Sequence, residues 1–331
     1  MKRFLKIIAA LVAVLAIVYF LGPKPAAPNY NNNLIQVPSD PAALEAFIRS
    51  KEAAHKVKPD NEARIVWAND SNKAKTPYVI VYLHGFSASQ EEGNPVHKNI
   101  AGQFGCNMYL ARLSEHGIDT IDPLVNMTAT SLWESAKEAY AIGKQLGDKV
   151  ILMGTSTGGT VALELASNFE DVAGLVLYSP NIAINNPSAF LSNNPWGLQI
   201  ARMVIGGKEN IIKNKPDNYK KYWNDHYRLE AVVELQELLE TTMIPSHFNK
   251  IKCPLLTLYY FKDEKNQDPV VKVSAMKEMF DAVATPANLK RMVPIPEAGN
   301  HVLASPIQSN DIVSVEKETA LFLEQIMQLK K

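Results

Sequence analysis

Apolar residues along this chain fall into short runs that alternate with amphipathic stretches. Short apolar runs that end at Gly, Pro or a polar residue are typical of strands buried on both faces of a sheet. Helical periodicity lies between the runs, and it is clearest over 131–146 and 160–166. This alternation predicts an α/β fold, a mostly parallel, doubly wound sheet with helices on both faces. The predicted strands are 64–68, 77–83, 107–111, 150–153, 172–180, 254–260 and 291–295.

The N-terminus has a different pattern. Three basic residues, Lys2, Arg3 and Lys6, precede an uncharged apolar run from Ile7 to Leu21. With the two apolar residues before Lys6, the segment approaches the ~20 residues that span a bilayer. A cleaved signal peptide shares these features, but the proline-rich residues 22–28 make a poor processing site. We favour an uncleaved signal anchor, with the basic end in the cytoplasm and the following domain periplasmic or extracellular. If the segment is cleaved, the domain is secreted.

These patterns divide the chain into a signal anchor or signal peptide (1–22), a linker (23–38) and an α/β domain (39–331). The linker is rich in Pro and Asn and is expected to be an extended tether. Ser39-Asp40-Pro41 predicts a helix start. Over about 181–250 the strand pattern stops, so we predict a helical cap without strands that supplies an apolar pocket. The alternative is a set of ordinary peripheral helices.

The segment Gly154-Thr155-Ser156-Thr157-Gly158 joins a predicted strand to a predicted helix. So sharp a turn forces its central residue into a strained backbone conformation, and the two glycines give the neighbouring chain room. The pentapeptide alone is common, but its position makes Ser156 a candidate nucleophile at an elbow, with its hydroxyl in solvent above the sheet edge.

A serine hydroxyl needs a neighbouring base, and the base needs a carboxylate to orient it. A serine, an acid and a histidine, each just after a strand, follow the chain order of the α/β-hydrolase triad. His301, in a loop after the last strand, is the candidate base. Asp268 is the favoured acid because Pro-Val-Val after it is typical of a helix start; Asp263 is the alternative.

The strand 77–83 runs directly into His84-Gly85-Phe86. A strand that ends in this way suits an oxyanion hole, built from the backbone N–H groups of Phe86 and Thr157. The alternative is a plain turn after a strand.

From about Ala63 to Leu329 the chain resembles the α/β-hydrolase superfamily, in its serine aminopeptidase and monoacylglycerol lipase-like branch. The resemblance implies a serine hydrolase that cleaves a carboxylic ester, such as a monoacylglycerol or a lysophospholipid. In that family the acid usually follows its strand sooner, whereas residues 262–267 intervene here. The matching segments are His84-Gly85-Phe86, Leu113-Ser114-Glu115-His116-Gly117, Gly154–Gly158, Asp268-Pro269-Val270-Val271 and Gly299-Asn300-His301.

Composition argues against several other classes of function. Charge is balanced, with 34 basic and 34 acidic residues, which argues against nucleic acid as the main partner. The two cysteines provide neither a disulfide framework nor metal-ligand spacing, and no nucleotide motif is present, so no cofactor or metal is expected. A peptidase or thioesterase on the same triad and a catalytically silent binding protein remain open. The expected partners are a small ester or lipid-like substrate and, through the N-terminal segment, a membrane.

Overall fold

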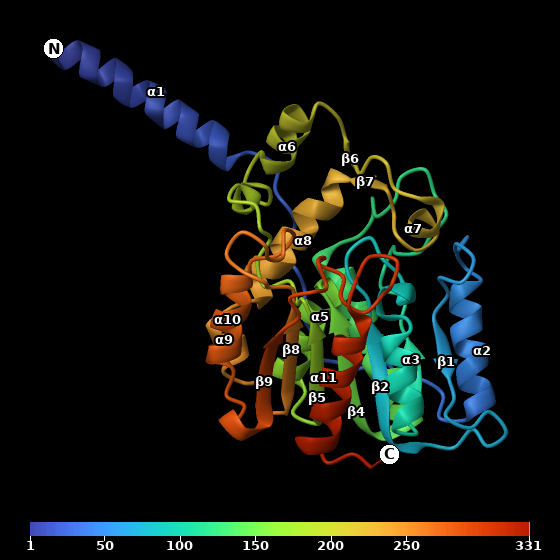
Figure 1. Cartoon of the computed structure of the whole chain (residues 1–331). Coiled ribbons are helices and arrows are strands. Elements are labelled where there is room, and N and C mark those ends of the chain that lie inside the picture. Colours follow the sequence, from blue (N-terminus) through green and yellow to red (C-terminus); the bar gives the residue numbers. More distant parts are fainter. Residues whose placement is uncertain (331) are drawn as a thin grey trace.

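The computed structural model describes residues 1–330, and its core is one seven-stranded sheet (Figure 1). The strands are β1 (Arg64–Val66), β2 (Thr76–Leu83), β3 (Asn107–Leu110), β4 (Gly147–Thr155), β5 (Val172–Tyr178), β8 (Leu255–Tyr259) and β9 (Lys290–Pro294). Their order is β1-β3-β2-β4-β5-β8-β9, and all neighbours are parallel except β1, which pairs antiparallel with β3 at the edge. All seven predicted strands are present. The strand order reverses between β2 and β4, where parallel α/β sheets usually bind ligands.

Helices cover both faces of the sheet, as the alternating pattern predicts. On β2, Val79, Val81 and Leu83 point to one face and belong to the core that also contains residues of α2, α4, α5, α8 and α10. Ile80 and Tyr82 point to the other face and pack against α3 and α11. Alternate side chains of a strand thus enter two separate cores, so these strands are apolar at every position. The helices are α2 (Pro41–Glu52), α3 (Val96–Gln103), α4 (Ala129–Leu146), α5 (Thr157–Asn168), α8 (Leu229–Thr242), α9 (Pro245–Phe248), α10 (Val273–Ala282) and α11 (Ile312–Gln325).

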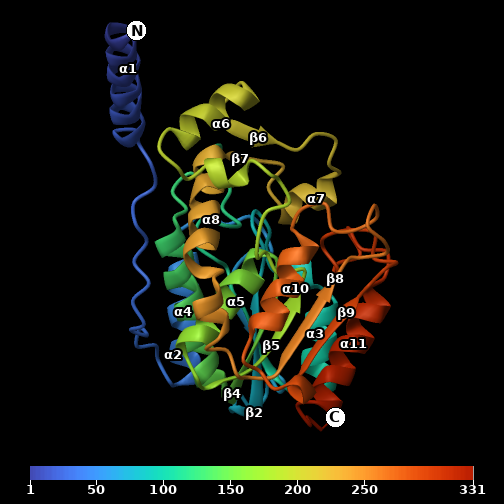
Figure 2. The ribbon, with the colours of Figure 1, turned by 90° about the vertical axis from the view of Figure 1, so that its left-hand side faces the viewer.

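The segment after β5 lies over the carboxyl ends of the strands (Figures 1 and 2). It contains α6 (Gly197–Ile205), α7 (Asp217–Tyr222) and a two-stranded antiparallel sheet of β6 (Glu209–Ile211) and β7 (His226–Arg228). The prediction of a strandless segment was therefore wrong. Each strand has only three residues, and β6 has the mixed sequence Glu-Asn-Ile, so neither one produces a recognisable period. The N-terminal half of α8 continues this cap, and the rest of α8 packs on the body.

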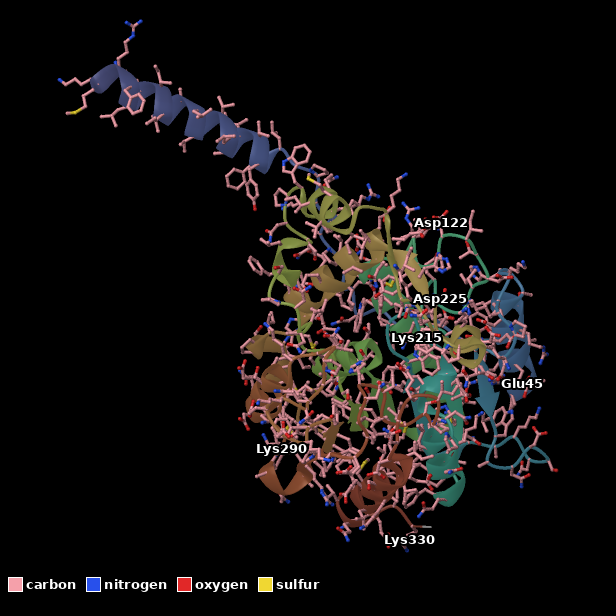
Figure 3. All side chains as sticks on the ribbon, turned by 45° about the horizontal axis from the view of Figure 1, so that its top comes forward. Glu45, Asp122, Lys215, Asp225, Lys290 and Lys330 are labelled. Atoms are coloured by element: carbon pink, nitrogen blue, oxygen red, sulfur yellow. The ribbon has the colours of Figure 1, made fainter. Side chains whose placement is uncertain are left out.

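The N-terminal helix α1 (Lys2–Phe20) extends away from the domain and meets it near its C-terminal end, where the indole of Trp196 donates to the carbonyl of Val18 (2.9 Å). Figure 3 shows its side chains pointing outward on all sides, and none of the helix is buried. Residues 22–38 form no helix or strand but lie along the side of the domain, between α2 and the cap (Figure 2). The next element begins as predicted, because Asp40 caps α2 by accepting the N–H of Ala43 (2.8 Å) and Pro41 occupies the first turn.

Two side chains of α4 hold residues 22–38 in place. The indole of Trp133 donates to the Asn31 carbonyl (2.8 Å). The ammonium of Lys137, which is fully buried, donates to Oδ1 of Asn31 (2.8 Å) and to the Asn33 carbonyl (3.1 Å). A buried lysine that lost these partners would be strongly destabilising, so these bonds dock the extended segment on the domain.

Candidate active site

The turn from β4 into α5 places Ser156 at the point where the strand order reverses. Its backbone has φ 52° and ψ −117°, a strained region for a residue with a side chain. The turn is tight because a Cβ at Gly158 would lie 1.9 Å from the carbonyl oxygen of Leu83, at the end of β2. The predicted elbow is therefore present. The residue as a whole is 6% exposed, and it lines the cavity beneath the cap.

His301 and Asp268 form a buried pair beside this turn. Oδ2 of Asp268 lies 2.7 Å from Nδ1 of His301. Its Oδ1 accepts the N–H groups of Val270 (2.9 Å) and Val271 (3.1 Å). A carboxylate at Nδ1 keeps the proton there, so Nε2 is the basic nitrogen. Nε2 has no protein partner within residues 1–330, and His301 and Ser156 line the same cavity.

Charge tunes both members of this pair. Burial opposes ionisation of Asp268. The His301 imidazole and the hydrogen bonds that the Asp268 carboxylate accepts outweigh burial, so they lower the pKa of this carboxyl below its usual value. Burial also opposes protonation of His301, but the Asp268 carboxylate outweighs it and raises the pKa of the imidazole above 6.5. The carboxylate is thus arranged to stabilise an imidazolium.

A closed loop between Phe261 and Gln267 explains why Asp268, and not Asp263, reaches His301. Within the loop, the N–H of Lys262 donates to the Asn266 carbonyl (2.8 Å). The chain then returns to the strand end, where the N–H of Asp268 donates to the carbonyl of Tyr260 (3.1 Å). Asp263 stays exposed in the loop and accepts hydrogen bonds from Asn266. The intervening residues therefore bulge outward without moving the acid from the end of β8.

The two residues expected to form the oxyanion hole lie on either side of Ser156. Thr157 is the first residue of α5, where the helix dipole favours negative charge. Phe86 follows the end of β2 and lines the cavity. Neither backbone N–H donates to a protein acceptor within the described residues 1–330.

His84 supports the loop that carries Phe86. Its Nε2 accepts the N–H of Leu113 (3.0 Å), so its Nδ1 carries the proton and donates to the Gly85 carbonyl (2.9 Å). Burial holds the pKa of this imidazole well below its usual value. His84 is therefore a neutral cross-link between two loops and has no free nitrogen to act as a base.

Glu92 is a site residue that the sequence did not reveal. It lies in the short helical turn η1 (Gln90–Gly93), is 2% exposed and accepts the N–H of Gly85 through Oε2 (2.5 Å). Burial raises the pKa of its carboxyl to about 7, although the Gly85 N–H and the nearby His301 imidazole act in the opposite direction. In sequence it is one of two adjacent glutamates in a polar loop, a pattern that favours solvated charges. No local signal distinguishes it.

The cavity above these groups has a volume of about 450 Å³. The cap and the strand-end loops give it a mainly apolar lining, which suits an acyl or alcohol group better than a charged one. Within residues 1–330, no cluster of three or more His, Cys, Asp or Glu side chains is placed to hold a metal ion. The apolar and aromatic lining residues are Phe86, Ile184, Ile212, Tyr219, Trp223, Tyr227, Val232, Leu235, Val270 and Val302.

A parallel sheet of this order, with a serine elbow after β4 and a histidine loop after the last strand, is an α/β-hydrolase fold. A family model described as serine aminopeptidase, S33, matches residues 129–298, just over half of the chain, and the chain belongs to that family.

Two individual relatives are less than 30% identical to this chain. A thermostable monoacylglycerol lipase of Bacillus sp. (strain H-257) is 28% identical over 196 residues, which cover 58% of this chain and 72% of the lipase. The chloroplastic protein PHYLLO of Arabidopsis thaliana is 24% identical over 276 residues, or 76% of this chain, but the match spans only 16% of that protein.

Solved structures share the fold. The structure described under the metagenome-derived lipolytic enzymes LipS and LipT has a TM-score of 0.62 at 18% identity, and the match covers 81% of this chain and 99% of the other. A thermophilic esterase from Thermogutta terrifontis has a TM-score of 0.52 at 18% identity, over 82% and 97% of the two chains.

The raised pKa of Glu92 predicts a specific pH dependence of stability. The folded protein retains a proton that the unfolded chain releases between its ordinary pKa of 4.5 and about 7. The stability that this neutral acid contributes is complete below the lower value and is lost as the pH rises through the higher one. In Glu92→Gln the side chain is neutral at every pH and still offers an oxygen to Gly85.

Between about pH 5 and 8, the wild type should therefore lose up to ~3 kcal/mol of unfolding free energy relative to Glu92→Gln. Urea titrations of both proteins in detergent at the two pH values measure this difference. The matched control is Glu297→Gln, at an exposed glutamate beside Lys262, which should follow the wild type. An equal pH response in Glu92→Gln and the wild type would contradict the assignment.

Proposed function

We propose that this chain is a membrane-anchored serine hydrolase that cleaves carboxylic esters through an acyl-Ser156 intermediate. The observation that carries the proposal is the buried Asp268–His301 pair, whose free Nε2 lines the same cavity as the serine at the elbow. Lipase and esterase relatives support an ester as the substrate, and the apolar cavity supports an apolar acyl or alcohol group.

In this mechanism, Oγ of Ser156 attacks the ester carbonyl while its proton passes to Nε2 of His301. The carbonyl electron pair moves to oxygen, and the N–H groups of Phe86 and Thr157 bind the resulting oxyanion, each for about 3–4 kcal/mol in the transition state. Collapse of this intermediate expels the alcohol, which takes the proton from His301. A water molecule, deprotonated by the same nitrogen, then attacks the acyl-serine. The bond between the acyl carbon and Oγ breaks, Oγ takes the proton back from His301, and the carboxylic acid leaves.

The helix α1 is the proposed anchor. Its 19 residues would extend about 28 Å, close to the hydrocarbon thickness of a bilayer, and no part of it is buried against the domain. The basic residues Lys2, Arg3 and Lys6 lie at its N-terminal end, which favours a cytoplasmic N-terminus and an extracytoplasmic domain.

Ser156→Ala should remain folded and lose turnover of a short p-nitrophenyl ester by a factor on the order of a millionfold. A fluorophosphonate probe, which reacts only with an activated serine, should label the wild type and Ser87→Ala but not Ser156→Ala. Ser87 is the matched control because it lines the same cavity and is also 6% exposed. Persistent turnover or labelling in Ser156→Ala would exclude this serine as the nucleophile. A wild type that hydrolyses aminoacyl p-nitroanilides and spares the ester would instead be a peptidase.

Asp268→Asn should lower kcat/KM by about 10⁴-fold, because the amide cannot fix the His301 tautomer or stabilise its imidazolium. The free imidazole is the active form, so activity rises with pH through the pKa of His301. Because the Asp268 carboxylate raises that pKa, its removal should move the acidic limb of the pH–rate profile to lower pH. The matched control Asp263→Asn should keep both the rate and the limb of the wild type. A larger loss in Asp263→Asn than in Asp268→Asn would assign the acid to Asp263.

A further inference from the structure

Apolar side chains gather on the outer surface of the cap. Among residues 22–330, twelve large apolar side chains are exposed, and eight of them lie between positions 190 and 211. Met203 and Val204 are 78% and 81% exposed. A contiguous exposed apolar patch of this kind typically marks a site of interaction with a protein, a ligand or a membrane. We call this set the cap patch: Phe190, Leu191, Trp196, Ile200, Met203, Val204, Ile205 and Ile211.

The cap patch adjoins the domain-facing end of α1. The indole of Trp196 donates to the carbonyl of Val18 (2.9 Å), and its backbone N–H donates to the carbonyl of Pro23 (3.0 Å). Figures 1 and 2 both show α1 leaving the molecule beside α6. A bilayer that contains α1 therefore has its near surface at the level of the cap patch.

The docked segment 22–38 fixes this orientation. It leads from α2 along α4 to the cap, and the bonds from Trp133 and Lys137 to Asn31 hold its middle. A free tether would let the domain turn any face to the membrane. A segment bound along its length makes α1 emerge at the cap end.

The charged residues around the cap patch are complementary to an anionic surface. Lys24, Lys208 and Lys213 are exposed, Glu209 beside Lys208 is half-buried, and none of these four has an ion-pair partner within the described part of the chain, which leaves the lysines in excess. Arg202, on α6 itself, pairs with Glu230 (2.6 Å). An apolar centre with a basic rim is the pattern that binds anionic lipid headgroups, and the exposed Trp196 suits the interfacial zone.

We propose that the cap patch docks onto the surface of the bilayer that holds α1. This inference rests on the anchor role proposed for α1. A second copy of the chain could cover the apolar centre, but it would leave the basic rim and the contact with α1 unexplained. The lipid surface accounts for all three features.

Docking would also bring the catalytic cavity to the lipid. Ile211 belongs to the cap patch, and the next residue, Ile212, lines the cavity. At this point a single backbone segment separates the surface of the cap patch from the cavity. An apolar ester could pass from the bilayer into the cavity beside this wall without crossing bulk water.

Lipid contact can be measured on the full chain in vesicles of phosphatidylcholine and phosphatidylglycerol. A fluorescent label is placed at Val204→Cys in the cap patch, at Leu11→Cys in α1, and at Val313→Cys as the matched control. Val313 is a similarly exposed valine, 74%, on α11. Doxyl lipids should quench the labels at 11 and 204 but not at 313; the unsubstituted chain gives the background from Cys106 and Cys253.

Quenching at 11 without quenching at 204 would overturn the docking but leave the anchor. No quenching at 11 would overturn both. A label at 204 that is shielded from doxyl lipid in a chain that forms dimers would assign the cap patch to a second copy, which also overturns the proposal.

A second measurement tests whether docking gives a lipid ester access to the cavity. The double variant Met203→Ser, Val204→Ser should hydrolyse a water-soluble ester at the wild-type rate and a long-chain ester in vesicles about tenfold more slowly, because two inserted side chains lose their apolar burial. Val313→Ser should match the wild type on both substrates. If the double variant hydrolysed both esters more slowly by the same factor, or both at the wild-type rate, access from the lipid side would be contradicted. If the wild type cleaved neither substrate, the hydrolase proposal would fail, and quenching alone would decide the docking.

Discussion

The candidate active site depends on one close contact, between the α-carbon of Gly158 in the first turn of α5 and the carbonyl of Leu83 at the end of β2. A side chain at this glycine would place its Cβ 1.9 Å from that oxygen, so only glycine lets the helix approach. The approach sets Ser156 beside the loop that carries Gly85 and Phe86. It also places Thr157 at the start of the helix, so the proposed nucleophile and both proposed oxyanion donors share one rigid corner. The strained backbone at Ser156 is a consequence of this corner.

Much of this arrangement could be predicted from sequence because it is local. Strands buried on both faces are apolar throughout, and a glycine on either side of a serine between strand and helix defines the elbow. The chain order of Ser156, Asp268 and His301 is also readable, because loops after parallel strands meet at one edge of the sheet. The structure brings His301 and Asp268 together and leaves Asp263 in its own closed loop.

Features that depend on distant parts of the chain were not readable. The strand β6 becomes a strand only by pairing with β7, and its three residues have no period of their own. Glu92 looks like a solvated loop charge until the fold buries it against the N–H of Gly85. The segment 22–38 has the composition of an extended tether, and nothing in that composition shows that Lys137 of α4 binds it. Tertiary contacts override local tendency in all three cases.

Capture of the covalent intermediate tests the central claim most directly. The full-length chain is mixed with excess p-nitrophenyl acetate, quenched in acid during turnover and digested for mass spectrometry. The account predicts an added acetyl mass on the peptide that carries Ser156, present in the wild type and absent in Ser156→Ala. Consumption of the ester with no acyl group on Ser156, or with the group on another residue, would contradict it.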